Sequence, residues 1–128
     1  FDFDRNELFN KMYEIDSNVI KLHGYVLQNF EMDQDGCASM IMTKEILEQH
    51  QVIPSEASLL VSTLGNVKGI KAWVFFIEES DQIRVRLRSK GPVINTIAKK
   101  YNGGGHPLAA VASIYSWEEK EEVMKDLR

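Results

Sequence analysis

Two adjacent strand patterns constrain the fold of this chain more than any other feature. Residues 83–89, IRVRLRS, alternate strictly between apolar and polar side chains, which is the period of a strand with one buried face. Residues 71–79, KAWVFFIEE, are rich in β-branched and aromatic residues and predict a second strand. We assign its aromatic residues Trp73, Phe75 and Phe76 to the core rather than to base stacking. The short polar segment between the two patterns predicts a hairpin.

Helical patterns flank these strands. Apolar residues recur at three- or four-residue spacing over 1–29, with Asp4 as the expected N-cap. Residues 30–42 predict a hairpin of two short strands, and residues 106–116 are expected to begin as a helix and end as a strand. Further helices are expected over 43–51, 54–65, 93–101 and 117–128. This order predicts an α+β fold: a mixed, mostly antiparallel sheet of about five strands flanked by helices and preceded by an N-terminal helical connector.

The composition disfavours several classes of partner. The formal net charge of −4 argues against the broad basic face that nucleic-acid duplexes require, but a small ligand held by one or two arginines remains compatible. Cys37 is the only cysteine and has no partner for an internal disulfide, which favours a reducing, cytoplasmic setting. No apolar run approaches the roughly 20 residues that cross a bilayer, so no membrane partner is expected.

The segment YNGGGHPLAA, residues 101–110, contains three consecutive glycines followed by a histidine. A glycine turn that feeds the N-terminus of a helix exposes backbone N–H groups to an anion, and Pro107 is favoured in a first helical turn. His106 adds a ring donor. The other interpretation is a flexible C-cap, for which one glycine suffices. Three glycines therefore favour a ligand, although neither a Walker loop nor a GxGxxG motif is present.

The arginines of the alternating strand are weaker evidence for a ligand site than the three glycines are. Alternating charged residues usually cover a solvated face, and we interpret Arg84 and Arg86 in this way. Arg88 lies at the end of the strand, where a returning helix would place it beside the glycines. A guanidinium group makes bidentate hydrogen bonds to phosphate or stacks on a base, so Arg88 is a candidate ligand-binding residue.

Three blocks together resemble a known family: GGGHPLAA at 103–110, RSKG at 88–91 and STLGNVKGIKAWVFFIEE at 62–79. They are similar to the accessory C-terminal domain of Asp-His-His (DHH) phosphoesterases. Within that superfamily the chain most resembles the nano-RNase type, which comprises bifunctional oligoribonucleases and phosphoadenosine-phosphate phosphatases. The resemblance implies that residues 1–29 connect to an N-terminal catalytic domain and that residues 30–128 form the DHH-associated substrate-binding domain.

The resemblance also implies a division of labour. A separate DHH domain binds two manganese ions that activate water, while the accessory domain holds a nucleotide or short single-stranded oligonucleotide. No Asp-His-His tripeptide occurs in this chain. We therefore expect no catalytic residue, metal ligand or cofactor here, and a manganese-dependent phosphoesterase as the parent protein. Carried onto this sequence, the substrate-binding residues are Arg88, Ser89, Gly103, Gly104, Gly105 and His106, with Asn95 as a weaker member.

One residue departs from the family pattern. Val111 stands where the family keeps a glycine, and a weaker grip on the ligand is expected if that glycine serves close backbone approach. The alternative function is a structural or dimerisation module in which the glycines make a tight turn at an interface, and whether the domain forms a homodimer stays open. Because the chain starts at Phe1 and enters a helical pattern at once, we interpret it as a portion of a longer protein.

Overall fold

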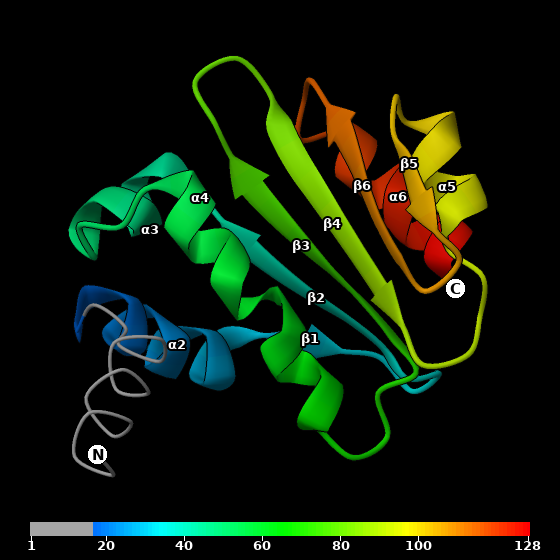
Figure 1. The fold of residues 1–128 in the computed structure, drawn as a ribbon, viewed down its shortest axis with the longest axis horizontal. Coiled ribbons are helices and arrows are strands. Elements are labelled where there is room, and N and C mark those ends of the chain that lie inside the picture. Colours follow the sequence, from blue (N-terminus) through cyan, green and yellow to red (C-terminus); the bar gives the residue numbers. More distant parts are fainter. Residues whose placement is uncertain (1–16) are drawn as a thin grey trace, which may run out of the picture.

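The computed structural model describes residues 17–128, in which one mixed sheet is flanked by helices on both faces (Figure 1). The strand order is β1-β2-β3-β4-β6-β5. β2 and β3 pair in parallel, and each of the other neighbouring strands pairs antiparallel. The strands are β1 (Glu31–Met32), β2 (Cys37–Met42), β3 (Ala72–Glu78), β4 (Ile83–Ser89), β5 (Gly104–His106) and β6 (Ala109–Ile114).

The helices divide between the two faces of the sheet. The connection from β2 to its parallel neighbour β3 runs through α3, α4 and the 3-10 helix η1, which with α2 lie over β1, β2 and β3 (Figure 1). α5 and α6 pack on the opposite face. The helices are α2 (Ser17–Asn29), α3 (Lys44–Gln49), α4 (Pro54–Ala57), η1 (Ser58–Asn66), α5 (Asn95–Lys100) and α6 (Glu119–Leu127).

β3 is the central strand of the core because it is buried on both faces. Trp73 and Phe75 point into the cluster beneath α2, α4 and η1, whereas Val74 and Phe76 point into the cluster beneath α5 and α6. Phe75 and Phe76 have no exposed surface. The assignment of these aromatic residues to the core is therefore confirmed.

β4 is fully buried on one face and half-buried on the other. Ile83, Val85 and Leu87 point into the cluster beneath α5 and α6, as the alternating pattern predicts. On the other face, the hydrophobic cluster beneath α2, α4 and η1 includes residues of β2 and β3 but none of β4, β5 or β6. The apolar cover of this face thus ends at β3, although η1 also lies close to β4. We call the part of this face on β4, β5 and β6 the arginine face; its residues are Arg84, Arg86, Arg88, Gly104, His106, Ala109 and Val111, with the buried Ser113 at its margin.

The predicted α+β fold is confirmed, including the β1–β2 and β3–β4 hairpins. Thr43 caps the predicted helix α3, since its hydroxyl accepts a hydrogen bond from the Ile46 amide at 3.2 Å. One predicted element is wrong: the chain after His106 forms no helix but passes through a turn at 107–108 into β6, and Gly104–His106 add a sixth strand. The part of the first predicted helix before Ser17, with its cap at Asp4, lies outside the described residues.

Candidate functional site

The sheet register places His106 and Arg88 on the same face. Ala109 of β6 pairs with Arg88 of β4 on one side and with His106 of β5 on the other. Residues directly opposite each other in antiparallel strands direct their side chains to the same face. Because neighbouring strands lie about 4.8 Å apart, the two backbones are about 10 Å apart with only the small Ala109 side chain between them. His106 is exposed and Arg88 half-buried.

The glycines do not form the helix N-terminus that the sequence predicts. Gly104 and Gly105 belong to β5 and pair with Val111 and Ala110 of β6. The amide of Gly103 donates a hydrogen bond to the Ala98 carbonyl oxygen at 2.8 Å. The expected cradle of free amides at a helix end is therefore absent from this hairpin, and the polar side chains of the arginine face become the main candidate contacts.

The three glycines differ in whether a side chain would fit at their position. A Cβ atom on Gly103 would overlap the carbonyl oxygen of Val111. Gly105 has a φ of +143°, and a Cβ there would lie 2.7 Å from the carbonyl oxygen of Ala109. Gly104 has no heavy atom within 4 Å of its Cβ position. The approach of β6 thus explains two of the glycines, and only Gly104 faces open space.

Ser89 lies away from the other predicted residues. It pairs with Ala72 and is buried on the opposite face of β4 from Arg88. Its hydroxyl accepts a hydrogen bond from the Gly91 amide at 3.1 Å and donates to the Lys71 carbonyl oxygen at 3.5 Å. Its amide donates to the carbonyl oxygen of Leu108, in the turn between β5 and β6. Ser89 therefore joins the end of β4 to this turn.

Asn95 contacts the glycine segment from the face of the sheet opposite the arginines. It begins α5, which packs on the face opposite the arginines. Its side-chain amide donates a hydrogen bond to the Gly105 carbonyl oxygen at 3.4 Å. This contact holds β5 against α5, so Asn95 supports the strand that carries His106.

The three arginines of β4 are in different electrostatic environments. Arg84 Nε lies 3.5 Å from Glu79 Oε2, and Arg88 Nη1 donates to the Leu87 carbonyl oxygen at 3.0 Å. Arg86 Nε is buried without a hydrogen-bond partner, the only such side-chain atom among residues 17–128. Burial lowers the pKa of Arg86, and the charges of Arg84 and Arg88 lower it further.

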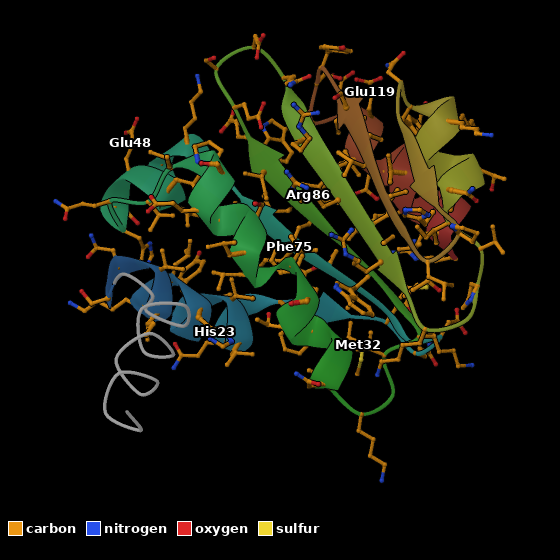
Figure 2. All side chains as sticks on the ribbon, viewed as in Figure 1. His23, Met32, Glu48, Phe75, Arg86 and Glu119 are labelled. Carbon is orange, nitrogen blue, oxygen red and sulfur yellow. The ribbon has the colours of Figure 1, made fainter. Side chains whose placement is uncertain are left out.

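Arg86 is therefore only partly solvated, because its side chain is half-buried and its Nε has no contact with water. It pairs with Phe75, which is fully buried in the cluster beneath α2, α4 and η1, and η1 also lies close to β4, so Arg86 lies at the border of the apolar cover (Figure 2). The sequence held a signal for this position. Residues 72–77, AWVFFI, are apolar on both faces, and such a strand needs cover on both sides. The residues paired with it on the next strand are then partly shielded from water.

The indole N–H of Trp73 donates to the Val61 carbonyl oxygen at 2.6 Å, and the ring is buried beneath η1. It is therefore not available to stack on a base at the arginine face.

In the described part of the chain, no three His, Cys, Asp or Glu side chains gather as a metal site would require. Over the same residues, no helix has both the length and the apolar character needed to cross a bilayer.

Comparison with known proteins gives consistent matches. The DHHA1 domain family matches residues 35–128. The chain is 58% identical over 127 residues to the bifunctional oligoribonuclease and PAP phosphatase NrnA of Bacillus subtilis, covering 99% of this chain and 41% of that protein. It is 40% identical over 129 residues to the probable bifunctional oligoribonuclease and PAP phosphatase NrnA of Streptococcus mutans, covering 100% of this chain and 42% of the relative.

A solved structure, an exopolyphosphatase-related protein from Bacteroides fragilis, superposes with a TM-score of 0.84 at 28% identity. The match covers 95% of this chain and 37% of that one. The chain thus spans about two fifths of the length of the curated relatives it matches.

Proposed function

The chain belongs to the DHHA1 domain family, and from this premise we propose that it is the substrate-binding accessory domain of an NrnA-type DHH phosphoesterase. It binds a nucleotide or a short single-stranded oligonucleotide through a phosphate group. Hydrolysis of phosphodiester or phosphomonoester bonds takes place at a two-manganese site in a separate N-terminal DHH domain. Residues 1–29 connect the two domains, and residues 30–128 form the binding domain.

The observation that carries this proposal is the shared row of His106, Ala109 and Arg88 across three strands. A guanidinium group and an imidazole ring on one open face provide a planar donor pair and a ring N–H donor. The small Ala109 between them leaves room for a phosphate group to contact both. Gly104 keeps the neighbouring position on β5 free of a side chain.

The remaining predicted residues support this row. Ser89 and Asn95 hold the ends of β4 and β5 by hydrogen bonds to backbone groups. Val111 lies on the arginine face in ordinary strand conformation, with no positive φ. Its side chain, where the family keeps glycine, adds an apolar patch beside Ala109 over which a ribose or base can lie.

The test is a calorimetric titration of the chain with a nucleoside 5′-monophosphate. We expect weak binding to the original chain and a loss of about 1–3 kcal/mol of binding free energy for His106→Ala and for Arg88→Gln, since each removes a charge-assisted or polar contact to phosphate. Lys99→Gln is the matched control, because it removes an exposed positive charge from α5 on the opposite face. Equal affinity of the His106, Arg88 and control variants would refute the proposed site.

A structural or dimerisation module is the second candidate. It is favoured by the position of β5 as the last strand of the sheet, since an unpaired edge is a template for another chain. The contacts of α5 with Gly103 and Gly105 oppose it, because they occupy part of that edge. Light scattering separates the two functions: a dimer that His106→Ala leaves intact and that binds no nucleotide supports the structural function.

A further inference from the structure

A second row of residues crosses the arginine face next to the proposed phosphate site. Val111 of β6 pairs with Arg86 of β4 on one side and with Gly104 of β5 on the other. This row repeats the arrangement of His106, Ala109 and Arg88, two residues further along each strand. Alternate residues of a strand lie about 6–7 Å apart, a separation that two consecutive phosphates of an extended nucleotide chain can match.

Arg86 brings a charge to this row that the described chain leaves unmatched. Its Nε is buried and lacks a hydrogen-bond partner, and the charged groups around it are Arg84, Arg88 and Glu79. Glu79 lies 3.5 Å from Arg84 Nε and also accepts a hydrogen bond from Gln82 at 2.9 Å. A buried donor without a partner is costly, and an anionic oxygen would remove that cost.

Gly104 provides the space that a ligand in this row needs. Its neighbours Gly103 and Gly105 must be glycine because β6 approaches their backbone closely. Gly104 has neither a close neighbour nor a positive φ, so the fold tolerates a side chain there. Its bare backbone on the open face is explained by a ligand that passes over it.

We propose that Arg86 and Gly104 form a second phosphate subsite, so that the arginine face binds two consecutive phosphates of a short single-stranded oligonucleotide. The inference rests on the proposed function, in which His106 and Arg88 bind the first phosphate. Arg84 is not available to bind a third phosphate, because Glu79 already pairs with it. Two phosphates are therefore the length of chain that this face binds by charge.

The experiment compares two probes on the 128-residue chain by calorimetry: a nucleoside 5′-monophosphate and a 5′-phosphorylated diribonucleotide. Arg86→Gln should lower the diribonucleotide affinity about tenfold, the effect of one charge-assisted hydrogen bond, and lower monophosphate affinity no more than the Arg84→Gln control. The slope of log affinity against log salt for the diribonucleotide should fall in magnitude by about 0.7, the value for one phosphate contact on a single strand. Gly104→Val should selectively weaken the diribonucleotide by filling the subsite.

The outcomes separate this inference from the proposed function. If Arg86→Gln and Gly104→Val leave the ratio of the two affinities unchanged while His106→Ala weakens both probes, the second subsite is refuted and the proposed function stands. If His106→Ala has no effect on either probe, the proposed function itself fails. Thermal unfolding of each variant confirms that a lost affinity does not come from a lost fold.

Discussion

Gly103, Gly104 and Gly105 are adjacent in the chain but have different physical reasons to be glycine. Gly103 and Gly105 lie where the backbone of β6 comes too close for a Cβ atom. Gly104 lies on the open side of the hairpin, where nothing in the described chain excludes a side chain. Glycine runs are often attributed as a whole to flexibility or to ligand binding, whereas here packing accounts for Gly103 and Gly105 and the proposed binding role concerns Gly104 alone.

This difference predicts that the same substitution has a large effect on stability at Gly103 and almost none at Gly104. Gly103→Ala should lower the free energy of unfolding by more than about 2 kcal/mol, because its methyl group would overlap the Val111 carbonyl and force β5 away from β6. Gly104→Ala should change it by no more than about 0.5 kcal/mol. Urea denaturation at neutral pH measures both, and equal losses in the two variants would contradict the steric assignment.

Among the elements, α5 and α6 fix the position from which β5 starts. Tyr101 follows the last residue of α5, and its hydroxyl donates to Asp126 Oδ2 of α6 at 2.7 Å. Lys100 Nζ lies 3.0 Å from the same oxygen. Burial, followed by this hydrogen bond, raises the pKa of Tyr101. Since Tyr101 also accepts the Ser113 amide through its carbonyl oxygen, it connects α6, α5 and β6 just before the glycines.

Tyr101→Phe should therefore destabilise the fold by about 1–3 kcal/mol, the range for a hydrogen bond to a charged partner. The ring itself is retained, so the loss reports the hydroxyl contact with Asp126. Tyr115→Phe is the matched control, because Tyr115 is 65% exposed. Urea denaturation curves of the two variants give the comparison, and an equal stability of both would show that the Asp126 contact contributes nothing.

β5 is the strand that the sequence did not predict. The other elements carry their own signal: alternation in β4, apolar aromatic residues in β3, and a polar cap before α3. Gly104–His106 have low strand propensity and form β5 only by pairing with β6, which is tertiary context. The same context determines the candidate site. Arg88 and His106 were identified from residue type, but the partial burial of Arg86 follows from the cover over the neighbouring strand β3, which the pattern of β4 itself does not encode.

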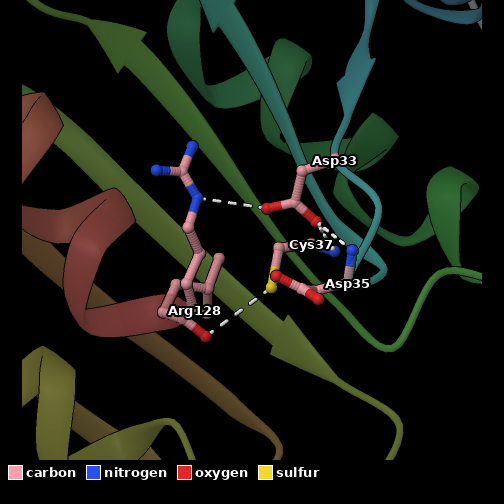
Figure 3. A network of polar contacts seen from close by, with 5 residues as sticks. Asp33, Asp35, Cys37 and Arg128 are labelled. Atoms are coloured by element: carbon pink, nitrogen blue, oxygen red, sulfur yellow. Dashed lines mark hydrogen bonds and ion pairs between the residues drawn. The ribbon is translucent and has the colours of Figure 1, made fainter.

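At the scale of the whole molecule, Asp33 ties the last residue of the chain to the β1–β2 turn (Figure 3). One carboxylate oxygen accepts the amides of Asp35 and Cys37, at 2.9 and 3.0 Å, and the other lies 3.1 Å from Arg128 Nε. These contacts stabilise the predicted hairpin turn between β1 and β2. The Cys37 thiol donates to the Leu127 carbonyl oxygen, and burial raises its pKa, so the thiol stays protonated and unreactive.

The same network predicts how stability depends on pH. The amide of Cys37, together with that of Asp35 and the Arg128 charge, lowers the pKa of Asp33 in the folded state. A lowered carboxyl pKa contributes stability that is fully present above the unfolded value near pH 4 and is lost as the pH falls through the folded value. Asp126 acts in the same direction, because Tyr101 and Lys100 lower its pKa.

Asp33→Asn should therefore be less stable than the original chain at pH 7, and this difference should shrink as the pH falls below about 4. Urea denaturation at pH 7, 4 and 3 measures the change, with the exposed Asp81→Asn in the β3–β4 turn as control. A difference that stays constant across these pH values would mean that the Asp33 charge does not contribute to folding.

The parallel pairing of β2 with β3 has a consequence for the order of assembly. It joins strands that residues 43–71 separate, so closing it costs more chain entropy than closing the β3–β4 and β5–β6 hairpins. The arginine face lies entirely on β4, β5 and β6, outside that slow junction. The proposed binding surface therefore forms by closing shorter loops than the one that joins β2 to β3.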